Sequence, residues 1–276
     1  TIYYGTPVAD DFIFHAPADT EYTGLPLAAT VEARRFSDGS ETGMGDITAV
    51  KYYLDGVPAE PTAPGTYTVK IDVAKGECYL AASDVTSPDW TFTITPAALT
   101  ASGSGTASGT FGGSLGSLSV SGLKAMLGTD EISGRWTLSG GDIPNVGDTG
   151  KYTAEFTADV HPEYYMPLTA EVTLDIAKAQ APAMADTTLS CYWGASGEKS
   201  VSLAGLPENT GEIYPATIAV SDVNGILAVD SARYSDGKLY FTLGENTEES
   251  IGNTAEITVT LPTQNYTDFT FRITVT

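Results

Sequence analysis

The sequence predicts an all-β chain in which three tandem β-sandwich modules form an elongated array. Apolar and polar residues alternate in stretches of about four to eight residues with turn signals between them, which is typical of half-buried antiparallel strands. A glycine-led strand, a turn and a closing strand also recur three times. The glycine and the turn tyrosine are 14 positions apart each time: Gly65 to Tyr79, Gly150 to Tyr164 and Gly252 to Tyr266. Strand order does not follow from this pattern, so β-grasp-like or other small β modules are the alternative.

The first copy of the repeated unit begins at Gly65. Every second residue from Tyr67 to Val73 is apolar, with threonine, lysine and aspartate between them. This alternation predicts a strand with one buried face. Gly65 permits a tight turn, and the hydroxyl of Tyr67 can reach back to the backbone as a tyrosine corner. We therefore give both residues structural roles.

The second copy assigns the same structural roles to Gly150 and Tyr152. The third copy has Thr254 where the tyrosine would stand, and its apolar phase is one residue out of step with Gly252. A one-residue slip exchanges the two faces of a strand, so the third copy needs a bulge or a shifted glycine. The only helix-like stretch that we expect is Gly122–Leu127.

The closing strands of the three units set the module boundaries. We expect modules over residues 1–97, 98–178 and 179–276. Modules of about 80 to 100 residues match an immunoglobulin-like (Ig-like) sandwich. The Gly- and Ser-rich stretch that opens the second module contains Leu99 and Phe111, so we interpret it as strand pieces with a loop. Short junctions are typical of stacked domains.

Composition limits the function classes. A formal net charge of −22 over 276 residues repels phosphates and anionic lipid, so nucleic-acid binding is not expected. The sequence contains no apolar run of about 18 residues, so no transmembrane helix is expected. Cys78 and Cys191 fall in different modules, and we expect no bridge between them. The chain has no signal-peptide pattern and ends in mid-pattern, so we expect an interior piece of a longer protein.

Three stretches resemble a known family. "EYTGLPLAATV" with "VKYYLDGVPAEPTAPGTYTV" resembles the MBG-type (mostly-β, glycine-rich) and bacterial Ig-like repeats of large surface proteins. "ISGRWTLSGGDIPNVGDTGKYTAEFTADVHPEYY" and "AEITVTLPTQNYTDFTFRITV" are similar to the repeat types that follow in such arrays. The resemblance implies a bacterial cell-surface or secreted protein, Gram-positive or from the gut, used as a spacer or adhesin. It transfers no catalytic residue.

Exposed aromatic side chains are the candidates for ligand binding. Trp193 with Tyr192, beside a turn, and Tyr164 with Tyr165 could form platforms for sugar rings. Trp90 and Trp136 stand in alternating strand stretches, where packing in the core is the expectation.

No other chemistry is expected. Two histidines, His15 and His161, lie in different modules, which argues against a zinc site or a catalytic triad. Asp-Gly pairs are better interpreted as hairpin turns than as calcium ligands. Lys70 lies on the polar face of its strand without a matching asparagine pattern, so no isopeptide crosslink is expected. We assign no catalytic, cofactor or metal residue.

The sequence thus predicts a monomeric, non-catalytic repeat region on the bacterial cell surface or secreted, acting as a stalk or spacer and as an adhesin for a host glycan or surface protein. Two alternatives stay open. One is a carbohydrate- or host-ligand-binding module, and the other is an accessory region of a larger secreted enzyme.

Overall fold

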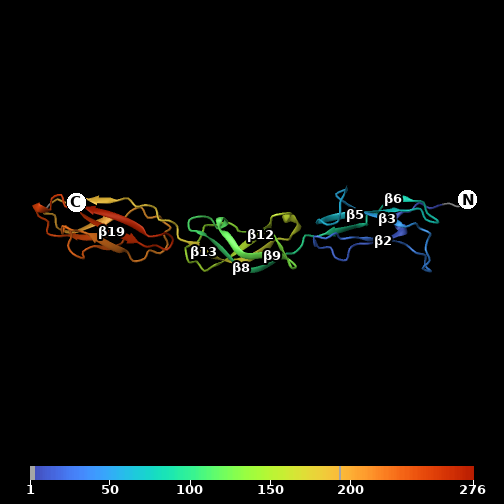
Figure 1. Cartoon of the computed structure of the whole chain (residues 1–276), viewed down its shortest axis with the longest axis horizontal. Coiled ribbons are helices and arrows are strands. Elements are labelled where there is room, and N and C mark those ends of the chain that lie inside the picture. Colours follow the sequence, from blue (N-terminus) through green and yellow to red (C-terminus); the bar gives the residue numbers. More distant parts are fainter. Residues whose placement is uncertain (1–3, 193) are drawn as a thin grey trace. The chain divides into compact units, whose positions relative to one another are not determined.

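The computed structural model describes residues 4–192 and 194–276, and nearly all of their regular structure is β (Figure 1). We keep the names first, middle and third module for residues 1–97, 98–178 and 179–276. Contacts divide the chain differently, into two compact units. Unit 1 comprises Thr1–Gly103, Leu123–Trp136 and Glu155–Thr169, and unit 2 comprises Ser104–Gly122, Thr137–Ala154 and Ala170–Thr276. The three-module boundaries therefore stay a prediction.

The first module holds seven strands and a short 3-10 helix, η1. A two-stranded sheet, β1-β2, accompanies a five-stranded sheet of order β4-β3-β5-β6, in which β7 pairs with β5. The elements are η1 (Ala9–Asp11), β1 (Phe12–His15), β2 (Thr30–Ala33), β3 (Ile47–Leu54), β4 (Val57–Pro58), β5 (Gly65–Val73), β6 (Ala82–Val85) and β7 (Thr91–Ile94).

Strand β5 supplies the centre of this module's core. Its alternate residues from Tyr67 to Val73 are buried, as the period-two pattern predicts. They pack with Phe12 of β1 and with Trp90, whose ring meets Phe12 edge-on at 6.2 Å between centroids. Apolar residues from both sheets thus enclose one core, which is the architecture of a sandwich.

The middle module contributes a six-stranded sheet of order β10-β9-β8-β13-β12-β11. Its elements are β8 (Thr100–Thr110), η2 (Leu115–Ser117), β9 (Ser119–Leu127), β10 (Asp130–Ile132), β11 (Gly134–Leu138), β12 (Lys151–Ala158), η3 (Pro162–Tyr164) and β13 (Leu168–Ala177). The Gly- and Ser-rich stretch is one long strand, β8, instead of strand pieces with a loop. A side chain at Gly109 would lie 2.4 Å from Leu118, so the small residue leaves room for that leucine.

The helix expected over Gly122–Leu127 is wrong, because this segment lies in strand β9. Gly122 has φ +80°, a left-handed conformation that an α-helix does not contain. Leu127 pairs with Asp130 across a two-residue turn that begins at Gly128, which has φ +60°. A tight hairpin therefore overrides the weak helical propensity of the segment.

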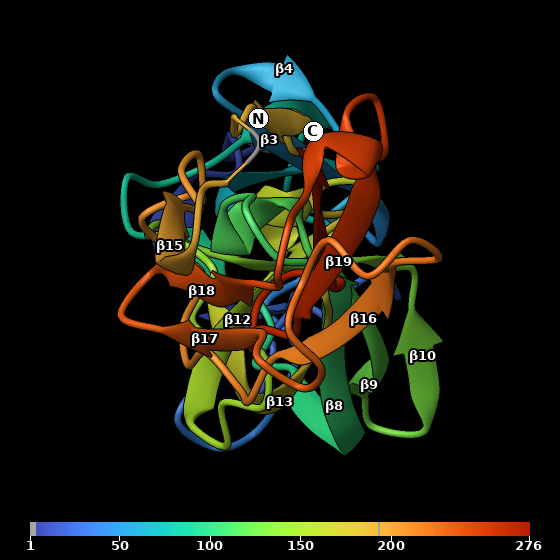
Figure 2. The same cartoon turned by 90° about the vertical axis from the view of Figure 1, so that its left-hand side faces the viewer.

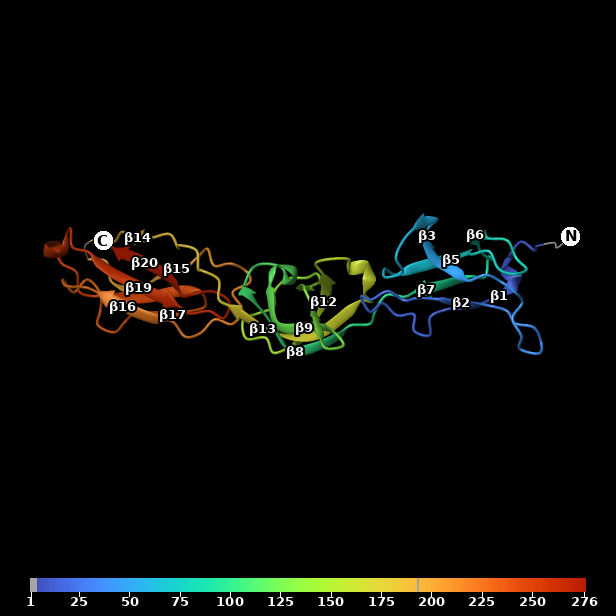
Figure 3. The same ribbon diagram turned by 45° about the vertical axis from the view of Figure 1, so that its right-hand side comes forward.

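The third module is a seven-stranded sandwich. Sheet β14-β20-β19-β16 faces sheet β15-β18-β17 across a shared apolar core (Figures 2 and 3). The elements are β14 (Thr187–Leu189), β15 (Gly197–Ser202), β16 (Thr217–Ser221), β17 (Arg233–Ser235), β18 (Lys238–Leu243), η4 (Glu248–Ser250), β19 (Ala255–Leu261) and β20 (Phe269–Val275). The shifted glycine of the third repeat is present: Gly252 precedes β19 by three residues, whereas Gly65 begins β5.

The first and last strands of the middle and third modules run parallel. In the middle module β8 pairs with β13 from Gly105–Val172 to Thr110–Ala177, and in the third β14 pairs with β20. The first module has the same pairing reduced to a single bridge, Glu21 with Thr95. A parallel partner is unusual in a sheet built from hairpins, and it places the start of the first strand and the end of the last strand at opposite ends of the pair.

Candidate functional site

A residue at or near the start of each module pairs with a turn of that module. We call these turns the tyrosine turns, because the central residue is always tyrosine. In each case this residue donates its N–H to the carbonyl of the residue before the tyrosine and accepts the N–H of the residue after it. The three bridges are Gly5 with Tyr79, Ala97 with Tyr165 and Ala179 with Tyr266. In the middle module Tyr165, not Tyr164, is therefore the equivalent of Tyr79 and Tyr266.

Tyr67 has the geometry of a tyrosine corner. Its side chain is fully buried, and its hydroxyl donates to the Ala63 carbonyl at 2.9 Å. Burial is the main cause that raises the pKa of this phenol, so it stays protonated and remains a donor. Gly65 has φ +148°, and a side chain there would lie 2.6 Å from Leu54 Cδ1. The turn therefore requires glycine.

Tyr152 differs from Tyr67 although the sequence gives both the same role. It is half-buried, and its hydroxyl lies 3.2 Å from the side-chain oxygen Oδ1 of Asp148 instead of a backbone carbonyl. The same Asp148 oxygen accepts the N–H of Gly150 at 2.7 Å. Asp148 therefore closes this corner in place of the backbone. Thr254, at the position without a tyrosine, is exposed.

Tyr164 and Tyr165 do not form a free platform. Both are half-buried and pack against Tyr22 of the first module, with ring centroids 5.1 Å and 5.9 Å away. Burial, followed by the neighbouring Tyr22, raises the pKa of the Tyr165 phenol. Glu21 adds a hydrogen bond to the N–H of Ala98 at 2.7 Å. These contacts, all within unit 1, make Tyr164 and Tyr165 part of a junction between the first and middle modules.

A second junction, within unit 2, centres on Asn265. This side chain is fully buried, donates to Asn145 Oδ1 at 2.7 Å and to the Asn209 carbonyl at 2.9 Å, and accepts the N–H of Val146 at 2.9 Å. The neighbouring Gln264 donates to the Val146 carbonyl at 2.8 Å. A loop of the middle module is thus hydrogen-bonded to the tyrosine turn of the third.

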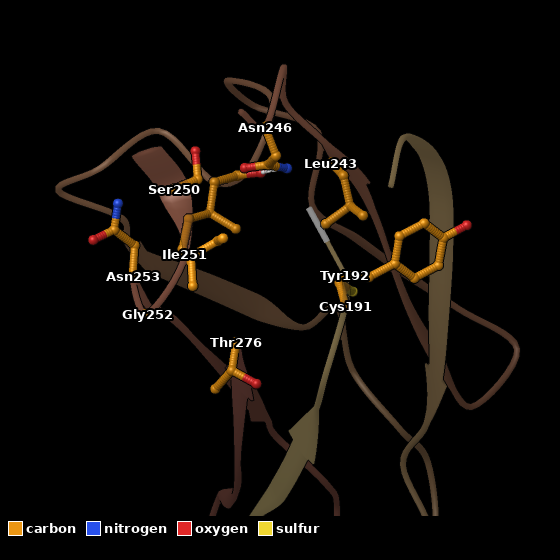
Figure 4. A pocket seen from close by; sticks show the side chains of 10 residues that line it. Cys191, Tyr192, Leu243, Asn246, Ser250, Ile251, Gly252, Asn253 and Thr276 are labelled. Carbon is orange, nitrogen blue, oxygen red and sulfur yellow. Dashed lines mark hydrogen bonds between the residues drawn. The ribbon is translucent and has the colours of Figure 1, made fainter. Parts of the chain in front are cut away.

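Tyr192 lines a hollow of about 250 Å³ at the end of the third module where β19 begins and β20 ends (Figure 4). The ring of Tyr192 is 80% exposed, and across the hollow lie Ile251 and Asn253 from the loop that precedes β19. Cys191 and Leu243 also line it. Trp193, the predicted partner of Tyr192, lies outside the described residues.

The other two tryptophans occupy different environments. Trp90 is buried, whereas Trp136 is half-exposed and packs at 5.2 Å against Phe156. Trp136 and Phe156 border a second hollow, of about 270 Å³, with Glu131 and Asp159 at its rim. This hollow lies within unit 1.

Potential metal ligands and nucleophiles are dispersed in the part of the chain that the structure describes. No group of three His, Cys, Asp or Glu side chains could hold a metal ion among those residues. Both cysteines are free thiols. His161 stacks on Tyr164 with 4.4 Å between ring centroids and pairs with Glu163. None of the helices among residues 4–192 and 194–276 has the length and apolar character that crossing a membrane requires.

Sequence reasoning missed the residues that join the modules. Tyr22, Phe111 and Asn265 lie outside the alternating strands from which the repeats were recognised. The sequence contained one signal for Asn265. The residue before the turn tyrosine differs in every copy, as expected for a position that contacts a different neighbour in each copy.

Comparisons with known proteins give structural similarity only. No family model matches the chain, and no curated protein matches it in sequence. Ig domains 1–4 of Sidekick-1 match 96% of this chain and 76% of their own at 13% identity, with a TM-score of 0.29. Drosophila N-cadherin EC1–4 matches 96% of this chain and 75% of its own at 14% identity, with a TM-score of 0.33. The human desmocollin-1 ectodomain matches 96% and 61% at 11% identity, with a TM-score of 0.30.

These similarities are too low to carry an argument about function. The all-β, sandwich-containing fold is confirmed by the sheets themselves. Membership of the MBG type stays a prediction, as does ligand binding by Tyr192, Trp193, Tyr164 and Tyr165.

Proposed function

We propose that the chain is a non-catalytic, load-bearing spacer in an extracellular protein. One observation carries this proposal: the first and last strands of a module are parallel neighbours. The chain enters the middle module at the start of β8 and leaves it at the end of β13, which are opposite ends of the pair. Tension along the chain therefore pulls the two strands past each other and loads all their hydrogen bonds together.

The junctions support the same function. Between the end of β7 and the first paired residue of the middle module, Ala97, lie only two residues, and only one lies between β13 and Ala179. Each junction is also tied by side chains, Tyr22 with Tyr165 and Asn145 with Asn265. A junction that is short and bonded transmits force directly from one module to the next. A bacterial cell-surface location, as a stalk, follows from the sequence resemblance and is part of this proposal.

The test compares two directions of pulling on the same strand pair by single-molecule force spectroscopy. Thr100→Cys with Ala177→Cys places handles at opposite ends of the β8–β13 pair, and Thr110→Cys with Ala177→Cys places them at the same end, because Thr110 pairs with Ala177. Both chains carry Cys78→Ser and Cys191→Ser. We expect a severalfold higher rupture force for the first pair, since forced unfolding follows the unfolding barrier. Equal forces would refute the load-bearing role.

A second candidate function, carbohydrate binding, is favoured by one observation, the hollow beside Trp136. An indole face with carboxylates at the rim is a common arrangement for holding a sugar ring, because the ring stacks while its hydroxyls donate. Titration with neutral oligosaccharides should then quench tryptophan fluorescence, and Trp136→Ala should abolish the change whereas Trp90→Phe should not. No quenching across a glycan set at millimolar concentration would remove this candidate.

A further inference from the structure

Both junctions contain an aromatic contact of the same kind. In the first, the ring of Tyr22 meets that of Tyr165 with centroids 5.9 Å apart and an interplanar angle of 80°. In the second, the ring of Phe111 meets that of Tyr266 at 5.6 Å and 74°. Edge-to-face geometry at these distances is the favoured arrangement for two aromatic rings. In each case the second partner is the central residue of a tyrosine turn.

The first partners of these contacts are also equivalent to each other, and Cys191 is their counterpart in the third module. Each of the three residues donates its backbone N–H to a carbonyl at the end of the closing strand. The accepting residue is either the last residue of that strand or the one directly after it. These bonds are Tyr22 to Thr95 at 2.9 Å, Phe111 to Ala177 at 3.0 Å and Cys191 to Thr276 at 2.6 Å. Two of the three such positions are therefore covered by the tyrosine turn of a following module.

The hollow in Figure 4 lies at the third of these positions. One wall is the loop before β19, and the corresponding loop of the middle module, before β12, is the one whose Asn145 and Val146 bind the next tyrosine turn. The other wall carries Tyr192. Ile251 is 62% exposed in this hollow and offers an apolar surface, and Asn253 from the same loop offers an amide. Both lie where the earlier junctions place their aromatic and amide contacts.

We infer that this hollow is a socket for the tyrosine turn of another module of the same kind. The occupant is a β module that carries a tyrosine turn. When a second copy of the chain follows the first, the turn around Tyr79 of the second copy is this occupant. In the first module the Tyr79 ring packs over Gly5 and is half-buried, and the preceding Cys78 is exposed. The contact is heterologous, socket to turn, and it repeats without closing.

The experiment joins two full chains in tandem, with the second copy beginning at Tyr4. Gly5 of that copy then follows Val275 of the first by three residues, the spacing of Ala97 after Ile94. Every copy carries Cys78→Ser. Two such tandem chains are compared, each with a single Cys191. In one, Cys191→Ser is made in the second copy, and in the other it is made in the first copy. The rate of alkylation by iodoacetamide, followed by intact mass, reports how open each hollow is.

We expect Cys191 of the first copy to react about tenfold more slowly than that of the second, because the following turn covers only the first hollow; tenfold protection corresponds to about 1.4 kcal/mol. Tyr79→Ala in the second copy should restore the rate, whereas Tyr53→Ala, away from the turn, should leave the protection intact. Equal rates in the two tandem chains would overturn the inference. So would protection that survives Tyr79→Ala. Neither result depends on the mechanical test.

Discussion

Replacing Asn265 with alanine should destabilise the third module more than any other asparagine substitution in it. Asn265 is fully buried, and its side chain makes three hydrogen bonds of 2.7–2.9 Å. Asn265→Ala removes all three and leaves the N–H of Val146 and the carbonyl of Asn209 without these partners. The loss therefore combines absent bonds with unsatisfied polar groups.

The magnitude follows from the number of bonds. A typical internal hydrogen bond contributes about 1 kcal/mol net, and a buried donor or acceptor left unpaired costs about 1–3 kcal/mol. Three bonds, with two of the partners on loops that water can reach, give about 3 kcal/mol. A free-energy change of that size corresponds to about a hundredfold change in an opening equilibrium.

Native-state hydrogen exchange measures this change where it occurs, without requiring the whole chain to unfold in one step. Amides of β19 and β20 should exchange about a hundredfold faster in Asn265→Ala. Asn246→Ala is the matched control in the same module, because the Asn246 amide makes only long contacts of 3.3 and 3.4 Å. A change of less than threefold for Asn265→Ala, or an equal change in both variants, would refute the reasoning.

Three further predictions concern the first module. Tyr67→Phe should lower its free energy of unfolding by about 1–2 kcal/mol, because the Ala63 carbonyl loses its buried donor, and urea unfolding should show this shift. Gly65→Ala should cost at least about 1 kcal/mol, since φ is +148° and the new Cβ would lie 2.6 Å from Leu54 Cδ1; an unchanged urea midpoint would contradict it. The Lys51 ammonium, 2.7 Å from Asp72, lowers the pKa of that carboxyl below its ordinary value. A lowered native pKa stabilises the fold above the unfolded pKa, so this contribution should disappear as the pH falls below about 4, and Asp72→Asn should flatten the pH dependence of unfolding in that range.

Much of the fold could be predicted from the sequence because strands with one buried face leave a strict signature. The alternation from Tyr67 to Val73 predicts both the strand and its buried face, and the slip at Gly252 predicts the shifted glycine. The helix at Gly122 and the broken strand before Phe111 were wrong for a common reason. Both strands depend on pairing, with Asp130 across a tight hairpin in one case and with the far residues 172–177 in the other, and pairing is not visible in local periodicity.

The candidate site was less predictable than the fold, because its residues act across module boundaries. Tyr164 and Tyr165 were chosen as exposed aromatics, yet Tyr22, more than a hundred residues earlier, half-covers them. The fourteen-residue interval selected Tyr164 as the repeated tyrosine. The backbone pairing selects Tyr165 instead, because the short helix η3 ends at Tyr164 and displaces the turn by one residue. An interval in sequence measures chain length, whereas equivalence is decided by hydrogen bonds.

The junction positions also differ between the modules in a way that fits their neighbours. The residue before the central tyrosine is Cys78, Tyr164 or Asn265, and each differs in what it can bind. Tyr164 meets the ring of Tyr22, and Asn265 supplies two amide donors and an acceptor to a polar loop. A tyrosine in place of Asn265 has one donor hydrogen and could not serve both Asn145 Oδ1 and the Asn209 carbonyl, and an asparagine in place of Tyr164 would lose the aromatic contact. Each turn is therefore matched to the end of the module that precedes it, so the order of the modules is itself encoded at these few positions.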